Sequence, residues 1–408
     1  MPNGPLALIT SHRYFALVAM ATIQACTSAL LGQNQVVVGE MLTLRSAVLG
    51  EDREIYIAKP AGYSGTTERY PVLYLLDAET HFRYASGVLE FLAFADRIPQ
   101  MIVVGIASGS RERRARDLTP VSNAEVDRRF TPSHGGAANF LSFLTGELMP
   151  TVDKKYRTRP YRVLVGHSHG GLFATYVLAE RPTAFQVYLA LDPSLSWDKG
   201  AVVDRVGVTL AGTKSLKADF FVAAAHSRDR PDRHISKLVE VLKEKAPAGF
   251  KSHFDWMKQE THMSVPLRGL HQGLEIVFDK WHLTNPLELF ERGGIEAIHN
   301  HFREGGERYG YERNTSPFMV SMVVAELIWK GNLEEASRVL LHDEKKYPVP
   351  WNQLDALARA YADRGENERA IHFYRESLKV NPKNDWAKRK LQEMGADDSK
   401  AKPNRDRQ

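Results

Sequence analysis

The sequence contains only one cysteine, Cys26, among its 408 residues. A single cysteine excludes an intrachain disulfide and any metal site built from several cysteines. Charge of one sign is not in large excess either, since 54 Lys and Arg against 49 Asp and Glu leave a formal net charge of +5. The basic residues are too dispersed to predict binding to nucleic acid. The 43% of hydrophobic and 25% of charged residues are typical of a globular protein, long enough for two folded units.

Long hydrophobic runs are also missing near the N-terminus. The apolar run at residues 14–25 is too short to cross a bilayer as an ordinary helix. Because basic residues precede it and small and polar residues follow, we expect residues 1–36 to be a secretory signal, with a frayed helix as the alternative. The run ends in IQAC at Cys26, which resembles a bacterial lipoprotein cleavage site, although Gln24 fits that pattern poorly. The sequence therefore predicts a secreted or periplasmic protein, whose only membrane contact would be a lipid on Cys26.

The clearest chemical signal is the GHSHG turn at residues 166–170, between a short apolar run and a helix-period segment. A G-x-S-x-G turn between a strand and a helix is the pattern of a nucleophile elbow. Such a turn strains the backbone of the serine, so the residues two before and two after it must be nearly free of side chain. We therefore interpret Ser168 as a nucleophile. The alternative is that the pattern occurs by chance in a glycine-rich loop.

The order of apolar runs predicts the fold. Between residues 71 and 259, short apolar runs alternate with helix-period segments, which indicates a mostly parallel sheet with helices on both faces. Two alternating runs at residues 41–60 predict an antiparallel hairpin at the edge of that sheet. Residues 111–120 are expected to form a basic loop. With the elbow, this pattern predicts an α/β-hydrolase fold, in which ligands bind beyond the carboxyl ends of the strands.

After Trp281 the strand signals end and the chain is helix-patterned. Positions 34 residues apart match, which is the tetratricopeptide period. We expect an α/β-hydrolase domain at residues 37–283, an all-α domain with two tetratricopeptide-like repeats at 284–395, and a disordered tail at 396–408. The matched positions are Leu327 with Tyr361, Gly331 with Gly365, Ala336 with Ala370, and Pro348 with Pro382.

A serine hydroxyl needs a general base, and the base benefits from an orienting carboxylate. His262 follows the last predicted strand, where a loop would return it to Ser168, so we predict it as the base; a surface histidine is the alternative. The acid is expected in the loop after residues 218–225, with Asp229 preferred to Asp232. Because arginines surround both carboxylates, a Ser–His dyad is the alternative.

Three groups are expected to face the substrate. The oxyanion would be bound by the backbone N–H of His169, directly after the nucleophile, and by a backbone N–H within residues 77–79. Arg116 would lie near the mouth of the pocket, where a guanidinium favours anionic or catechol-rich esters. The alternative for Arg116 is a solvated position in a charged loop.

Several blocks of sequence together resemble the Putative esterase family of α/β hydrolases. That family includes esterase D, the feruloyl esterases, the mycolyltransferases and the enterochelin (siderophore) esterases. The resemblance covers about residues 37–283 and is strongest to the siderophore-esterase branch, some of whose relatives carry a C-terminal helical extension. The matching blocks are YPVLYLLDAETHF, RDLTP, NFLSFLTGELMPTVDKKYRT, VGHSHGGLFATYVL, DPSLSWD and ETHMSVP.

The resemblance implies Ser168 as the nucleophile, His262 as the base, and the backbones of Glu79 and His169 as the oxyanion donors. Two positions depart from the family pattern. Ala78 stands where the family usually has glycine, which is tolerable if the backbone there is not left-handed. Ser196 stands where a tryptophan is expected beside Trp197, which changes the shape of the pocket, so Trp197 joins Arg116 among the predicted substrate-binding residues.

These observations predict a serine hydrolase of the EC 3.1 type that cleaves carboxylic esters through an acyl-enzyme on Ser168. Siderophore-type or aryl esters are the suggested small-molecule substrates, and no metal or organic cofactor is implied. One alternative is acyl transfer to an alcohol by the same residues. The other is a catalytically weak interaction module, in which the helical repeats bind a protein partner.

Overall fold

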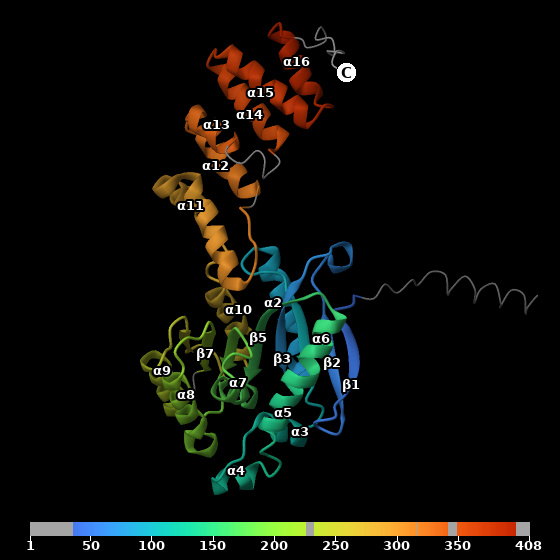
Figure 1. Ribbon diagram of the computed structural model, residues 1–408, viewed down its shortest axis with the longest axis vertical. Helices are drawn as coiled ribbons and strands as arrows, with labels where there is room; N and C mark the ends of the chain where they lie inside the picture. The colour runs from blue at the N-terminus through green and yellow to red at the C-terminus, as the bar shows by residue number, and fades with distance from the viewer. Residues whose placement is uncertain (1–35, 226–231, 316, 342–348, 397–408) are drawn as a thin grey trace, which may run out of the picture. The chain divides into compact units, whose positions relative to one another are not determined.

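The computed structural model describes residues 36–225, 232–315, 317–341 and 349–396 (Figure 1). The predicted signal up to residue 35 with Cys26, the predicted acid Asp229, Pro348 of the repeats and the tail from residue 397 lie outside the described residues. The chain divides into two compact units, Met1–Glu40 and Met41–Gln408. The second unit contains the predicted site.

An eight-stranded sheet with the strand order β1-β2-β4-β3-β5-β6-β7-β8 organises the molecule (Figure 1). β2 pairs with β4 in antiparallel orientation, and all pairs from β4 through β3 to β8 are parallel. This confirms the predicted α/β-hydrolase fold with a mostly parallel sheet. The strands are β1 (Glu40–Arg45), β2 (Asp52–Ala58), β3 (Tyr70–Leu76), β4 (Ile102–Ile106), β5 (Thr158–His167), β6 (Val187–Leu191), β7 (Asp219–Ala225) and β8 (Lys251–Met257).

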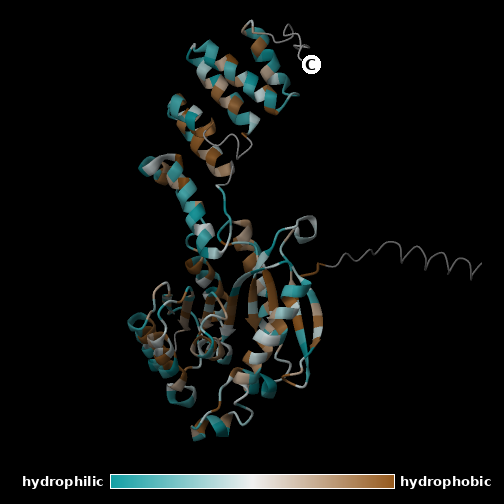
Figure 2. Ribbon diagram, viewed as in Figure 1, coloured by the Kyte–Doolittle hydropathy of each residue, from teal (hydrophilic) through white to brown (hydrophobic). Residues whose placement is uncertain are grey.

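The central strands are apolar because both of their faces are covered. Every residue of β3, β4, β6 and β7 is buried, and Figure 2 shows these strands as mainly hydrophobic. One core cluster lies between the sheet and α5 to α9, and a second lies between the sheet and α2 and α10. The helices are α2 (Ala78–Phe94), α3 (Arg111–Leu118), α4 (Glu125–Phe130), α5 (Ala137–Phe143), α6 (Met149–Lys155), α7 (His169–Glu180), α8 (Ala201–Gly212), α9 (Arg233–Glu244) and α10 (Val265–Val277).

The predicted basic loop at residues 111–120 is wrong, because most of this segment is the helix α3. Its N-cap is Ser110, whose side-chain oxygen accepts a hydrogen bond from the backbone N–H of Arg113 at 3.1 Å. A serine cap satisfies one of the backbone donors that a helix start leaves unpaired, and arginine and alanine have high helix propensity. The high charge of this segment therefore does not indicate a loop.

The C-terminal part of the described chain is all helical. Here Gly331 and Gly365 both adopt a φ of 77°, and both Ala336 and Ala370 are fully buried in one core cluster. The glycine pair thus shares a backbone conformation and the alanine pair a buried environment, while the assignment to the tetratricopeptide class stays a prediction. The helices are α11 (Pro286–Tyr309), α12 (Pro317–Trp329), α13 (Leu333–Leu341), α14 (Trp351–Asp363), α15 (Asn367–Val380) and α16 (Asp385–Glu393).

The end of α11 belongs to the core of the sheet. Tyr309 is fully buried and packs against Tyr161 and Phe278, and its neighbour Arg308 pairs with Asp219 at 3.0 Å. The α/β core therefore includes residues beyond position 283. Among the described residues, none of the helices combines the length and the apolar composition needed to cross a bilayer.

Candidate active site

Ser168 lies on the sharp turn between β5 and α7. Its backbone angles, φ 60° and ψ −116°, are rarely adopted by residues with a side chain, and such strain is typical of functional sites. The turn closes only because its neighbours lack side chains. A Cβ on Gly166 would overlap the carbonyl group of Gly170, and one on Gly171 would approach Pro193 Cα to 2.9 Å. The glycines therefore permit the conformation that holds the serine beyond the end of the strand.

His262 follows β8 and contacts a carboxylate. Its Nδ1 lies 2.6 Å from Oδ2 of Asp192, the residue directly after β6. The other carboxylate oxygen, Oδ1, accepts a hydrogen bond from the backbone N–H of Ala225 at the end of β7, at 3.0 Å. The backbone N–H of Asp192 in turn donates to the carbonyl oxygen of Ala223 at 2.8 Å. Asp192 is thus fixed between two neighbouring strands, and it can hold the imidazole in one orientation.

Asp192 is not the acid that the sequence predicts. The predicted acid, Asp229, follows β7 and lies outside the described residues. Its rival Asp232 is the N-cap of α9, where the carboxylate accepts from the backbone N–H of His234 at 2.8 Å. One signal for Asp192 was available, because it directly follows an apolar strand and keeps the chain order Ser, acid, His.

The serine hydroxyl has a second serine as its neighbour. Ser168 Oγ lies 3.2 Å from Ser194 Oγ, and the backbone N–H of Ser194 donates to the carbonyl oxygen of Ser168 at 3.1 Å. In the described part of the chain, no hydrogen bond joins Ser168 to His262. A base often approaches its serine only when substrate binds, so this spacing is compatible with a catalytic role.

A second histidine supports the loop that carries His262. The Nε2–H of His167 donates to the backbone carbonyl oxygen of His262 at 2.7 Å, and the two rings lie 4.5 Å apart. Burial, together with the neighbouring His262 and His81, lowers the pKa of His167 to about 4. His167 is therefore neutral at neutral pH and can serve as a fixed hydrogen-bond donor.

Two helices begin beside each other at the carboxyl edge of the sheet. α2 begins at Ala78, one residue beyond the end of β3, and α7 begins at His169, one residue beyond the end of β5; these two strands are neighbours. The first N–H groups of a helix have no acceptor within that helix, and they carry partial positive charge. The left-handed residue here is Asp77, with φ 56°, and not Ala78, so an alanine in place of glycine is tolerated. Glu79 and His169 thus lie in the first turns of adjacent helices.

The two predicted substrate-binding residues have different surroundings. Arg116 donates from NH2 to Glu51 Oε1 at 2.7 Å and from Nε to Asp117 Oδ1 at 2.8 Å, so its guanidinium is already held by carboxylates. Trp197 is almost fully buried, and its Nε1–H donates to the carbonyl oxygen of Pro120 at 3.0 Å. The Trp197 ring lies edge-on to His169, the first residue of α7, with ring centroids 5.8 Å apart. Of the two residues, only Trp197 contacts a residue next to Ser168.

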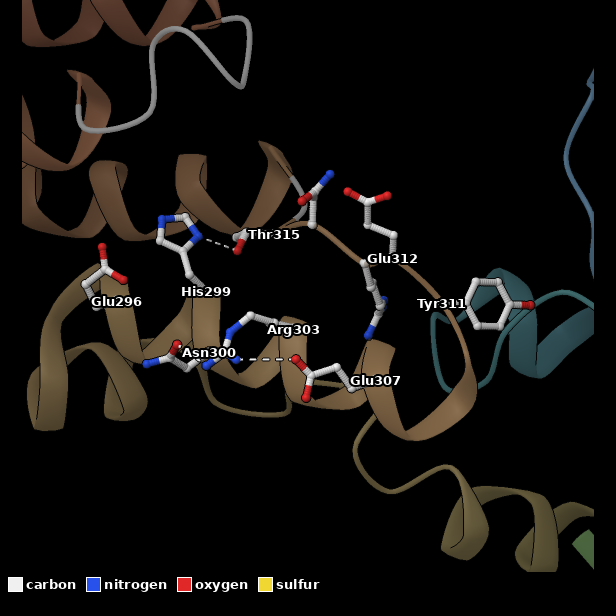
Figure 3. Close-up of a pocket in the computed structure, with 10 residues that line it drawn as sticks. Glu296, His299, Asn300, Arg303, Glu307, Tyr311, Glu312 and Thr315 are labelled. Atoms are coloured by element: carbon white, nitrogen blue, oxygen red, sulfur yellow. Dashed lines mark hydrogen bonds and ion pairs between the residues drawn. The ribbon is translucent and has the colours of Figure 1, made fainter. Parts of the chain in front are cut away.

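A further polar cluster contains none of the predicted site residues. A cavity of about 580 Å³ lies along α11 and residues 311–315, where His299 Nδ1 contacts Thr315 Oγ1 at 2.6 Å and Arg303 donates to Glu307 at 3.3 Å (Figure 3). Across the described ranges, no three or more His, Cys, Asp or Glu side chains are arranged to hold a metal ion.

Comparison with known proteins adds family information to this geometry. The family model described as Putative esterase matches residues 46–241. Ferri-bacillibactin esterase BesA of Bacillus subtilis (strain 168) is 31% identical over 233 residues, which are 52% of this chain and 79% of that protein.

Solved structures resemble a larger part of the chain. The structure of an IroE-like serine hydrolase from Shewanella oneidensis is similar, with 29% identity, a TM-score of 0.60, and coverage of 74% of this chain and 97% of that one. An uncharacterised protein from Capnocytophaga ochracea DSM 7271, at 20% identity, shares the fold over 88% of this chain and 99% of its own, with a TM-score of 0.66.

Proposed function

Because the chain belongs to the Putative esterase family of α/β hydrolases, we propose that it hydrolyses carboxylic esters through an acyl-enzyme on Ser168. The observation that carries this proposal is the 2.6 Å contact between His262 and Asp192, located beyond the same end of the sheet as the strained Ser168. A serine in an elbow, a histidine and a carboxylate that orients it are the parts that nucleophilic acyl transfer needs.

In this proposal the first half of the reaction forms the acyl-enzyme. Ser168 Oγ attacks the ester carbonyl carbon while Nε2 of His262 takes its proton. Nδ1–H of the imidazolium donates to Asp192, which stabilises the charge on the ring. Backbone N–H groups of Glu79 and His169, at the N-termini of α2 and α7, donate hydrogen bonds to the negatively charged carbonyl oxygen. The intermediate then collapses, and His262 returns the proton to the leaving alcohol.

The second half releases the acid. Water gives a proton to His262 and attacks the acyl carbon, and Ser168 leaves with that proton when the second intermediate collapses. If an alcohol took the place of water, the same residues would perform acyl transfer instead. No observation on the described residues favours that acceptor, so hydrolysis is the proposed reaction.

For the substrate we propose siderophore-type or aryl esters. Two features support this choice. The Bacillus subtilis relative is named as a ferri-bacillibactin esterase. In addition, Trp197 is flanked edge-on by His134 and His169, at 5.7 and 5.8 Å, which gives an aromatic environment beside Ser168. Aromatic groups pack favourably against such ring edges and faces.

A fluorophosphonate probe tests the proposed nucleophile directly. We expect the wild-type protein to be labelled on Ser168 and to hydrolyse members of a panel of acyl and aryl esters. Ser168→Ala should abolish both labelling and turnover. Ser64→Ala is the matched control, because this exposed serine lies between β2 and β3, outside the elbow, and it should leave both unchanged. A wild-type protein that neither reacts with the probe nor turns over any ester would overturn the proposed function.

A further inference from the structure

One guanidinium connects the two segments that carry the proposed oxyanion donors. Arg114, on α3, donates from Nε to Asp77 Oδ1 at 2.7 Å and from NH2 to Asp77 Oδ2 at 2.8 Å. The same NH2 group donates to the carbonyl oxygen of His167 at 3.3 Å. Asp77 is the residue before α2, and His167 is the residue before Ser168. Arg114 therefore spans from one oxyanion segment to the other.

The carboxylate at the centre of this bridge is held tightly. Asp77 is buried and left-handed, with φ 56°, and its Oδ1 also accepts from the hydroxyl of Ser108 at 2.8 Å. The side chain of Glu79 accepts from the backbone N–H groups of Ser108 and Gly109, each at 3.1 Å. The start of α2 is thus attached to the loop after β4 by two carboxylates. A bidentate Arg–carboxylate pair adds a fixed direction to this attachment.

We infer that Arg114 is a positioning residue for the oxyanion hole: through Asp77 and the His167 carbonyl it fixes the distance between the backbone donors of α2 and α7. This inference rests on the proposed function for its catalytic consequence. Oxyanion donors act only within a narrow distance of the developing charge, and a displacement of about 1 Å can cost about 100-fold in rate. A lysine could not replace Arg114, because one ammonium cannot reproduce the planar fork on both carboxylate oxygens.

A competing role for Arg114 is direct binding of an anionic substrate through its remaining nitrogen, NH1. The two roles differ in their dependence on substrate charge. A positioning residue affects every substrate, whereas a charged ligand to the substrate affects anionic substrates alone. The variant Arg114→Lys also distinguishes the two roles, because lysine keeps the positive charge but loses the bidentate geometry.

The experiment compares Arg114→Lys and Arg114→Gln with Arg113→Gln as the matched control. Arg113 lies on the same helix, is one-third exposed, and pairs with Glu51 at 3.5 Å rather than with either oxyanion segment. The measurements are the rate of labelling by a small neutral fluorophosphonate, and kcat and KM for a neutral ester and for an anionic ester of the same size. We expect both Arg114 variants to lower the labelling rate and kcat by about 10- to 100-fold, with little change in KM, and the control to stay within about twofold.

Amide hydrogen exchange gives a readout that does not depend on activity. Peptides covering residues 77–80 and 167–170 should exchange faster in both Arg114 variants, and Asp77→Asn should produce the same pattern. Thermal unfolding confirms that each variant is folded. Normal labelling in Arg114→Lys, or a loss confined to an anionic ester, would overturn the inference, as would unchanged exchange in both segments. A wild-type protein that does not label would instead remove the proposed function, while the exchange data would still decide whether Arg114 bridges the segments.

Discussion

Two histidine–aspartate contacts lie at opposite ends of the same parallel strands, and they have different third partners. Beyond the carboxyl ends, His262 Nδ1 contacts Asp192 at 2.6 Å. At the amino end of β7, Asp219 contacts His253 Nε2 at 3.4 Å. The other oxygen of Asp192 accepts from a backbone N–H, whereas Asp219 is also paired with Arg308 at 3.0 Å. The first pair lies near a strained serine, and the second lies where α11 packs on the sheet.

The difference shows that a His–Asp pair does not define a site by itself. A carboxylate that is already neutralised by a guanidinium has less capacity to stabilise a positive imidazole. Asp219 therefore serves mainly to attach Arg308, and with it the buried end of α11, to the α/β core. Within the described residues, Asp192 forms no ion pair with an arginine, so its charge is available to His262.

The largest expected effect separates the two histidines. His262→Ala should lower kcat for ester hydrolysis by about 10³- to 10⁶-fold, because the serine loses its general base. His253→Ala, at the other end of the sheet, should stay within a few-fold of wild type. Steady-state kinetics on one activated aryl ester checks both. Equal losses of kcat in the two variants would show that the losses come from reduced stability and not from a missing catalytic group.

Substitution of Asp192 should mainly change kcat, whereas substitution of Asp219 should mainly change the free energy of unfolding. Asp192→Asn should lower kcat by about 10²- to 10⁴-fold, since the amide favours the wrong tautomer of His262. Asp219→Asn should leave kcat nearly unchanged and lower the free energy of unfolding by about 1–3 kcal/mol, because Arg308 loses the more buried of its two carboxylate partners, Asp219 and Asp279. Kinetics and urea unfolding measure the two effects.

The kinetics of Asp229→Asn complete this test. If Asp229→Asn lowers kcat and Asp192→Asn does not, then Asp229 is the carboxylate that orients His262, as the sequence predicts. If neither substitution lowers kcat, a Ser–His dyad is the better description of the site.

The pH dependence of stability should include a contribution from the carboxyl edge of the sheet. Burial lowers the pKa of His167 to about 4 from its usual 6.5, so the folded ring resists protonation while the unfolded ring accepts a proton below about pH 6.5. The corresponding stability is present above pH 6.5 and is lost as the pH falls toward 4. His167→Gln should reduce the slope of unfolding free energy between pH 6 and 5 by about 1 kcal/mol per pH unit. The exposed His271→Gln serves as the control, and a slope unchanged by His167→Gln would contradict the burial argument.

Much of the fold could be predicted because its signals are local. Apolar strands, the glycine-bounded elbow and the 34-residue spacing each follow from short-range packing and backbone constraints. The acid could not be assigned in this way. Asp192 and Asp229 each come soon after an apolar strand, and only the folded sheet brings one of them to Ala225 and His262. Which loop turns toward the histidine is a tertiary property.

The arginines illustrate the same limit at a smaller scale. Successive residues of a helix are rotated by about 100°, so two positions two residues apart point in nearly opposite directions. Arg114 faces Asp77, whereas Arg116 faces Glu51 and Asp117. In a predicted loop, the direction of a side chain does not follow from its position, so nothing in the sequence favoured Arg114 over Arg116. The choice of Arg116 rested on the RDLTP block rather than on a helical face, and its contact with substrate stays a prediction.

The smallest expected effect concerns Arg116. Because its Nε, NH1 and NH2 groups all donate to the carboxylates of Glu51 and Asp117, little of its hydrogen-bonding capacity is left for a substrate. We expect Arg116→Ala to lower the melting temperature by a few degrees, through the loss of these ion pairs, and to leave kcat/KM nearly unchanged. The decisive measurement is the ratio of kcat/KM for an anionic ester to that for a neutral ester of the same size. A ratio within about twofold of wild type is expected, since a change of 1.4 kcal/mol in binding would alter it tenfold. A selective loss on the anionic ester would return Arg116 to the substrate site, and would show that its ion pairs with Glu51 and Asp117 open when substrate binds.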